Sequence, residues 1–160
     1  MFRVGFGTDI HRLVPGMPLI IGGVAIGSDH GADGHSDADV LLHAITDAVL
    51  GSLALGDIGT HFPDSEPRWQ NAESSEFLLY AAGLVRERGY HVLNLDCVID
   101  LEGPKLRPHI EGMRENIAKC LDLDTSAVSV KAKTGEGVDA VGESLAIRAQ
   151  AVVLVSNEPE

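Results

Sequence analysis

The chain alternates between two spacings of hydrophobic residues, one typical of strands and one typical of helices. Short runs rich in Val, Leu and Ile, which suit a pleated and half-buried surface, mark the strands. They predict strands over residues 3–8, 19–26, 91–101, 128–133 and 146–155. In three longer segments, apolar residues recur every three or four positions, which predicts helices.

The predicted helices have recognisable ends. The first begins near Ser36, where Ser36 and Asp39 resemble a capping box, and ends before the turn at 56–59. The second covers 74–88 and stops at a glycine, a residue that adopts the left-handed conformation common after helices. The third covers 108–121 and opens on a proline, which suits a first helical turn. The predicted loops are 12–18, 27–34 and the polar stretch that ends at about residue 71.

Strands interleaved with helices predict an α/β protein in the form of an α+β sandwich. We expect a single mixed sheet of four to five strands with the helices packed on one face, and one domain over residues 1–160. The hydrophobic content of 44% supplies enough apolar surface for one core. The pattern alone does not give the strand order.

Composition narrows the choice of partners and of compartment. Twelve basic and 24 acidic residues give a net charge of −12, which opposes binding to nucleic acid or to an anionic membrane. No apolar stretch is long enough to span a bilayer and no signal peptide is recognisable, so a cytoplasmic protein is predicted. Cys97 and Cys120 form no Cys-x-x-Cys pattern and are predicted to be core thiols.

Asp9, His11 and His43 form a candidate site for a divalent metal ion. Side chains two apart on a strand point to the same face, so Asp9 and His11 project together if the first strand reaches them. His43 lies one helical turn from Asp39 and from Asp47 on the predicted polar face of the first helix. Either carboxylate is placed to hold the imidazole nitrogen that faces away from the metal.

The ligand types leave alternatives open. Three protein ligands and a vacant fourth position describe catalytic zinc, but two histidines and one carboxylate also hold iron in non-haem oxygenases. Such an oxygenase should show a jelly-roll strand pattern, which the helical segments oppose. The simplest alternative has no metal, with Asp9 capping a turn and both histidines in hydrogen-bonded, half-buried positions.

Longer motifs carry a resemblance to a known family. Residues 7–11 (Gly-Thr-Asp-Ile-His) and 34–48 (from Gly-His-Ser-Asp to Thr-Asp-Ala) resemble segments of the 2-C-methyl-D-erythritol 2,4-cyclodiphosphate synthase family. So do residues 55–64 (Leu-Gly-Asp-Ile-Gly-Thr-His-Phe-Pro-Asp), 104–106 (Pro-Lys-Leu) and 130–136 (Val-Lys-Ala-Lys-Thr-Gly-Glu). The resemblance covers nearly the whole chain.

The resemblance implies a phosphorus–oxygen lyase of the non-mevalonate isoprenoid pathway. In this family, the 2-phosphate of 4-diphosphocytidyl-2-C-methyl-D-erythritol 2-phosphate attacks the β-phosphorus, which releases CMP and closes a cyclic diphosphate. The nucleophile belongs to the substrate, so the protein positions groups and stabilises charge. The resemblance also implies a ferredoxin-like or chorismate-mutase-like sheet and a homotrimer whose active sites lie between subunits.

By resemblance, particular residues take particular roles. Asp9, His11 and His43 match the zinc ligands, and Glu136 matches the carboxylate that helps hold Mg²⁺ or Mn²⁺ between the α- and β-phosphates. His35 and Thr134 match catalytic residues that stabilise the transition state, and Glu136 is expected to be a further catalytic residue. His35 and Ser36 are expected at the start of the first helix, where free N–H groups favour phosphate.

The resemblance also assigns residues to the parts of the substrate. The methylerythritol moiety is expected at Asp57, Ile58, Gly59, Phe62, Pro63, Asp64, Ser65 and Glu66. The cytidine moiety is expected at Leu101, Glu102, Gly103, Pro104, Lys105, Leu106 and Arg107. The phosphates of the CMP portion are expected beside Lys133, Thr134, Gly135 and Glu136.

One region departs from the family pattern. Many relatives carry a Phe and an Arg that line a central channel for isoprenoid diphosphates, and this chain has Ala140 and Glu143 in that region. Anion binding in such a channel is therefore not predicted for this chain. A second interpretation, a non-catalytic and metal-dependent cytidine-nucleotide-binding module, differs from the synthase in forming no product.

Overall fold

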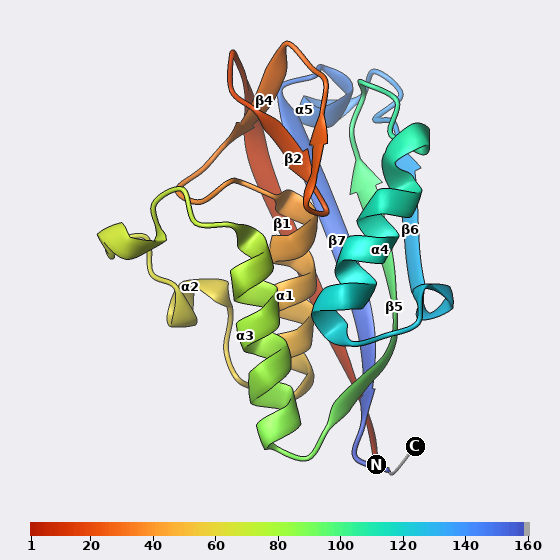
Figure 1. Ribbon diagram of the computed structural model, residues 1–160. Helices are drawn as coiled ribbons and strands as arrows, with labels where there is room; N and C mark the ends of the chain where they lie inside the picture. Colours follow the sequence, from red (N-terminus) through yellow and green to blue (C-terminus); the bar gives the residue numbers. More distant parts are fainter. Residues whose placement is uncertain (159–160) are drawn as a thin grey trace.

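The computed structural model describes residues 1–158, and a five-stranded mixed sheet forms its centre (Figure 1). Its strand order is β4-β1-β7-β5-β6, in which β5 and β6 are parallel and the other neighbours are antiparallel. The sheet strands are β1 (Phe2–Pro15), β4 (His30–Asp33), β5 (His91–Asp100), β6 (Val128–Lys133) and β7 (Ala146–Ser156). A separate hairpin consists of β2 (Leu19–Ile21) and β3 (Val24–Ile26).

Three long helices lie on one face of this sheet (Figure 1). They are α1 (Val40–Ser52), which packs against β1 and β7, α3 (Ser74–Glu87), which packs against α1, and α4 (Ile110–Leu121), which packs near β6. Two short helices, α2 (Ile58–His61) and α5 (Asp139–Gly142), and 3₁₀ turns at Pro67–Trp69, Arg107–His109 and Thr125–Ala127 complete the chain. Within residues 1–158, none of the helices has the length and apolar character needed to cross a membrane. The predicted fold class is confirmed.

Strand β1 is longer than predicted because the chain continues to pair after the metal-site residues. Arg12 is opposite Asp33 and Pro15 is opposite His30, so β4 occupies the edge of the sheet beside the last part of β1. The predictions of loops over 12–18 and 27–34 were therefore wrong in these parts. Their Gly and Pro content indicated loops, whereas tertiary pairing decides the outcome.

The predicted strand over 19–26 is a tight hairpin, and the start of the first helix was also placed wrongly. Gly22 and Gly23 both have positive φ, at 59° and 73°, which breaks the strand. Helix α1 begins at Val40, and Asp39, not Ser36, caps it. The fully buried Asp39 carboxylate accepts hydrogen bonds from the N–H groups of Gly22, Gly23, Leu41 and Leu42, at 2.7–3.1 Å. It therefore ties the hairpin to the helix.

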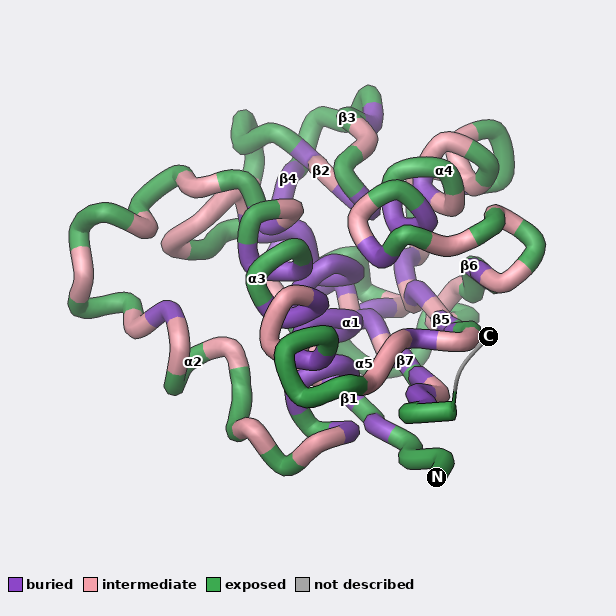
Figure 2. The backbone as a smooth tube through the Cα atoms, turned by 60° about the horizontal axis from the view of Figure 1, so that its bottom comes forward, coloured by how far each residue is buried: buried purple, intermediate pink, exposed green. Residues whose placement is uncertain are grey.

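Exposure alternates along the middle of β1 (Figure 2), so the two faces of the strand differ in burial. On the helix side, Gly5 has no room for a side chain, because a Cβ there would lie 1.8 Å from the carbonyl oxygen of Ala48. The opposite face of β1 is largely apolar, and the three long helices α1, α3 and α4 do not cover it. Its exposed side chains include Phe2, Val4, Phe6 and Ile10 of β1 and Val152 of β7.

Candidate active site

Asp9, His11 and His43 converge on the helix-covered face of the sheet. Asp9 and His11 share the inner face of β1, and His43 reaches them from α1. The Asp9 Oδ2 atom lies 2.9 Å from His11 Nε2 and 3.0 Å from His43 Nδ1, and the two nitrogens are 3.2 Å apart. One ligand atom from each residue lies within 4.8 Å of the others, so the group can hold a metal ion. The predicted convergence is confirmed.

His11 is oriented by the strand beside it. Its Nδ1 lies 2.9 Å from the carbonyl oxygen of Asp33 in β4, and an N–H must bridge this contact because a carbonyl can only accept. When the ring is neutral, Nε2 then carries the lone pair and faces Asp9 and His43. A backbone carbonyl is a common partner for the second nitrogen of a metal-binding histidine.

His43 is held by hydroxyl groups, not by either of the predicted carboxylates. Its Nε2 lies 2.8 Å from Ser74 Oγ and 3.0 Å from Ser36 Oγ, while Nδ1 faces the cluster. Asp39 caps α1, and Asp47 accepts from the Ile58 N–H at 2.7 Å. The prediction that Asp39 or Asp47 supports His43 was wrong, because both carboxylates satisfy backbone N–H groups instead. His43 is also buried, at 8% exposure, and not on a polar face.

The charges of the cluster favour a cation. Burial raises the pKa of Asp9, but hydrogen bonds and charges from His11 and His43 outweigh it and hold that pKa well below its usual range. Burial lowers the pKa of His11, but the hydrogen bond with Asp9 outweighs it and raises that pKa. A carboxylate oxygen and two imidazole nitrogens with their lone pairs converging form a donor set that fits a divalent metal ion.

The cluster lies in the wall of a cavity of about 280 Å³. Nine of the predicted site residues line it: Asp9, His11, His35, Ser36, His43, Ile58, Gly59, Phe62 and Asp64. Gly34, Trp69 and Phe77 also line it and were not predicted. The cavity therefore joins the predicted metal site to part of the predicted methylerythritol site.

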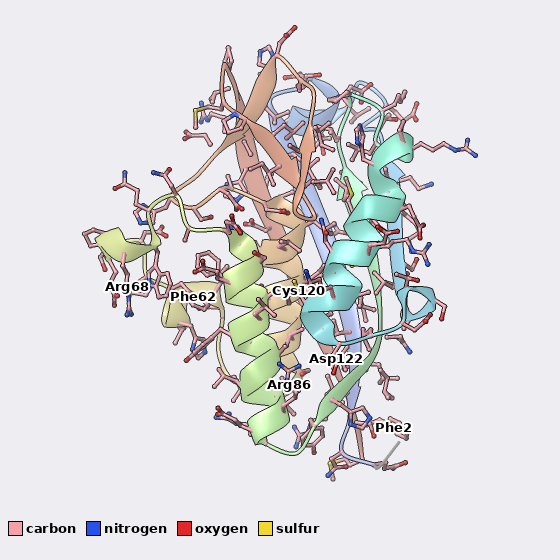
Figure 3. The ribbon with its side chains drawn as sticks, in the orientation of Figure 1. Phe2, Phe62, Arg68, Arg86, Cys120 and Asp122 are labelled. Carbon is pink, nitrogen blue, oxygen red and sulfur yellow. The ribbon has the colours of Figure 1, made fainter. Side chains whose placement is uncertain are left out.

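An aromatic wall closes one side of this cavity. The ring centroids of Phe62 and Phe77 are 4.3 Å apart, and those of Phe62 and Trp69 are 5.0 Å apart. Figure 3 shows Phe62 and Arg68 on the segment that projects beside α3. Phe77 belongs to the apolar stripe of α3 and Trp69 to a polar loop, so no local signal separated them from core or surface residues. Among the described side chains, the Trp69 indole nitrogen is buried and has no hydrogen-bond partner.

Several predicted residues lie outside the cavity lining. Asp57 is exposed and caps α2, accepting from the Thr60 N–H at 2.8 Å and the Thr60 hydroxyl at 2.7 Å. Pro63, Ser65 and Glu66 occupy the following loop, where the Glu66 carbonyl oxygen lies 3.5 Å from His35 Nε2. His35 and Ser36 precede α1 by several residues. The prediction that they stand at its free N-terminus was wrong, because Asp39 takes the first N–H groups.

The remaining predicted residues gather at a second cavity, of about 140 Å³. Its lining residues are Leu101, Pro104, Lys105, Leu106, Arg107, Ala132, Lys133 and Thr134. Glu102 accepts from the Gly135 N–H at 2.9 Å, and the Thr134 hydroxyl donates to Glu136 at 2.8 Å. Gly103 lies in the same loop. The lining residues of the two cavities do not overlap.

The region that departs from the family pattern forms the short helix α5 and its end. Ala140 lies in α5 and Glu143 follows it, and both side chains are exposed.

The fold and the site define a class: a mixed α/β enzyme domain with an Asp-His-His metal site at one face of its sheet. The YgbB family model matches residues 2–156, and the chain belongs to this family. The 2-C-methyl-D-erythritol 2,4-cyclodiphosphate synthase of Salinibacter ruber is 51% identical over 155 residues, which cover 97% of this chain and 99% of the relative. The chloroplastic synthase of Arabidopsis thaliana is 52% identical over 154 residues, 96% of this chain and 67% of the relative.

Solved structures agree with the sequence comparison. A CDP-bound 2C-methyl-D-erythritol-2,4-cyclodiphosphate synthase superposes with a TM-score of 0.89 at 41% identity, covering 96% of this chain and all of that one. The bifunctional IspDF of Campylobacter jejuni superposes with a TM-score of 0.93 at 38% identity, and the match covers 97% of this chain and 42% of that longer chain. The predictions of family and of enzyme are confirmed, and the chain is a cyclodiphosphate-forming lyase.

Proposed function

We propose that this lyase converts 4-diphosphocytidyl-2-C-methyl-D-erythritol 2-phosphate to 2-C-methyl-D-erythritol 2,4-cyclodiphosphate and CMP. The observation that carries the proposal is the convergence of Asp9, His11 and His43 beside His35 and Ser36 in one cavity. In the reaction, an oxygen of the 2-phosphate forms a bond to the β-phosphorus. The bond from that phosphorus to the bridging oxygen breaks, and the oxygen leaves with CMP.

Zinc is the ion we assign to Asp9, His11 and His43. Two imidazoles and one carboxylate match the three-ligand sites of catalytic zinc, which keep one position free. When bound, such an ion orients and polarises a phosphate oxygen. His11 and His43 each have their outer nitrogen engaged, so the three side chains are already in place for the ion.

The chain's own side chains position the phosphates around this site. Ser36 Oγ and the His35 ring line the same cavity as the metal group, so both can donate to phosphate oxygens. Thr134 and Lys133 would hold the phosphates of the CMP portion, and the Thr134 hydroxyl lies next to Glu136. We assign Glu136 to a second ion, Mg²⁺ or Mn²⁺, because such ions prefer oxygen ligands.

A complete site requires two subunits under this proposal. Ile10, Arg148, Asp100 and Lys133 stand in one row across β1, β7, β5 and β6, so the metal group and the phosphate-binding strand end are three strand spacings apart. That distance is roughly 14 Å. Following the family resemblance, we propose a homotrimer in which one subunit gives the metal group and its neighbour gives the loop over 101–107. The uncovered apolar face of β1 supports this assembly.

This function is tested by ³¹P NMR, which distinguishes the phosphates of the substrate from those of the products. Purified protein is incubated with the substrate, Zn²⁺ and Mg²⁺, and the ³¹P NMR spectrum is compared with a chelator-treated sample. Equal amounts of CMP and a cyclic diphosphate, formed only with metal, are expected. An unchanged spectrum from folded, metal-loaded protein would favour the nucleotide-binding module.

The cytoplasmic location stays a prediction, since the Arabidopsis relative is named chloroplastic.

A further inference from the structure

A line of three hydrogen-bonded groups runs from the half-buried Asp37, through Ser74, to His43 of the metal group. Asp37 Oδ1 accepts from the hydroxyl of Ser74, the first residue of α3, and Ser74 Oγ lies 2.8 Å from His43 Nε2. Ser74 is completely buried. Asp37 and Ser74 belong to neither cavity lining and had no role in the family resemblance.

The carboxylate of Asp37 fixes the direction of this line. Oδ1 accepts from the Asp39 N–H at 3.2 Å and Oδ2 accepts from the Ser74 N–H at 3.0 Å. Because both oxygens act as acceptors, the proton between Asp37 and Ser74 belongs to the Ser74 hydroxyl. Ser74 Oγ then has only lone pairs left to offer. His43 must therefore carry its proton on Nε2, which leaves the Nδ1 lone pair for the metal.

Ser36 alone does not impose this choice. Its Oγ lies 3.0 Å from His43 Nε2 and accepts weakly from the Ala38 N–H at 3.3 Å. No carboxylate accepts its proton among the described residues, so the Ser36 hydroxyl is able to rotate and donate, either to His43 or towards the cavity. Because Ser74 accepts the hydrogen bond from His43 Nε2, the Ser36 hydroxyl can donate to a phosphate oxygen of the substrate instead.

We propose that Asp37 and Ser74 are positioning residues that select the metal-binding tautomer of His43. The proposal rests on the proposed function only in that the site holds a metal ion. It assigns support of the metal ligand to Ser74 and contact with substrate to Ser36. Removal of such a supporting partner typically weakens metal binding by about 10- to 100-fold.

The test reads the tautomer directly. Long-range ¹H–¹⁵N NMR of metal-free protein, in mildly alkaline buffer, distinguishes imidazole protonated on Nε2 from imidazole protonated on Nδ1. His43 of the unaltered chain should be protonated on Nε2. In Ser74→Ala, and in Asp37→Asn, where Ser74 stays in place, the Nδ1-protonated form should appear. Zn²⁺ affinity, measured by chelator competition, should fall by about 10- to 100-fold in both.

Two further variants separate support from packing. Ser75→Ala removes the neighbouring hydroxyl of α3, which lies 3.5 Å from Glu73 and does not contact His43, and should change neither reading. Ser36→Ala should lower turnover while Zn²⁺ affinity stays within about threefold, because it is assigned to substrate. Folded Ser74→Ala and Asp37→Asn proteins with an unchanged tautomer and unchanged Zn²⁺ affinity would overturn the proposal. A normal tautomer in a protein that forms no cyclic diphosphate would instead count against the proposed function.

Discussion

A Cβ atom on Gly7 of β1 would lie 2.0 Å from the carbonyl oxygen of Ala44 in α1. Gly7 precedes Asp9 by two residues, and Ala44 follows His43. The distance between the metal ligands of the strand and the ligand of the helix therefore depends on a glycine at this point.

We expect Gly7→Ala to separate β1 from α1. The helix backbone at Ala44 cannot move aside for the new Cβ atom without shifting the whole helix. The free energy of unfolding should therefore fall by at least about 1–3 kcal/mol, and Zn²⁺ affinity should fall as well. Urea unfolding and chelator competition measure the two effects. The control is Gly83→Ala in α3, where a Cβ meets nothing within 4 Å. That change should stabilise by about 0.5–1 kcal/mol, since alanine favours helix more than glycine does. Equal stability of the two variants would contradict the close approach.

His43→Ala should abolish the metal site and turnover while the fold is retained. Removing one of three ligands should weaken Zn²⁺ binding by more than about 100-fold, beyond the effect of losing a supporting group. Metal content after dialysis, together with the ³¹P assay, gives the result. His91→Ala, which changes a histidine at the start of β5 outside the cavity, is the matched control. Full turnover by His43→Ala would remove the metal site from the mechanism.

The stability of the metal-free protein should depend on pH through Asp9 and His11. The raised pKa of His11 stabilises the fold below its ordinary value of 6.5, and this stabilisation is lost as pH rises through the raised pKa. The lowered pKa of Asp9 stabilises the fold above pH 3.8, its ordinary pKa, and this stabilisation is lost only in strong acid. The melting temperature without metal should therefore fall above pH 6.5.

Metal binding should show the reverse dependence. Zn²⁺ must displace the His11 proton, so affinity should increase by about tenfold per pH unit until His11 is deprotonated in the free protein. Calorimetric titration across this range, in buffers of different ionisation enthalpy, counts the released protons. An affinity that does not change with pH would show that His11 is not a ligand.

Phe6→Glu tests the proposed assembly. Phe6 is 62% exposed on the uncovered face of the sheet, and a charge there should not be tolerated between subunits. Light scattering should show loss of the trimer, and turnover should fall by more than about tenfold while Zn²⁺ binding remains. Leu79→Glu, at a residue 48% exposed on α3, should leave the trimer intact. A trimeric and active Phe6→Glu protein would exclude this face as the interface.

The fluorescence of the one tryptophan in the chain should report substrate binding. Trp69 lines the metal cavity, and its buried indole N–H has no partner among the described residues. Substrate with its methylerythritol phosphate moiety should shift the emission, whereas CMP, bound at the second cavity, should not. An equal response to both ligands would contradict the separation of the two sites.

The metal group could be predicted because each of its members obeys a local rule. Asp9 and His11 share a strand face, and His43 lies within a long apolar segment that the sequence marks as a helix. The groups that support them could not be predicted, because Asp33 comes from a strand in a glycine-rich segment and Ser74 from a helix 31 residues after His43. Those contacts depend on tertiary packing.

The same limit applies to the substrate residues. Leu101, residues 104–107 and residues 132–134 line one cavity because β5 and β6 are parallel neighbours, a pairing that the hydrophobic pattern does not encode. Only the resemblance grouped them, and their individual roles stay predictions. Asp39 and Asp47 lie one helical turn from His43 and were predicted to support it, but both carboxylates accept hydrogen bonds from backbone N–H groups instead.

The two ends of the described chain lie side by side at one end of the sheet, where the Met1 amino group donates to Asn157 at 2.7 Å (Figure 1). Asp9 follows Phe2 by seven positions of extended strand, which is roughly 23 Å. A second catalytic unit can therefore be joined at this end without reaching the metal group. The bifunctional Campylobacter jejuni chain, of which the match to this chain covers 42%, is an example of a longer chain that contains this fold.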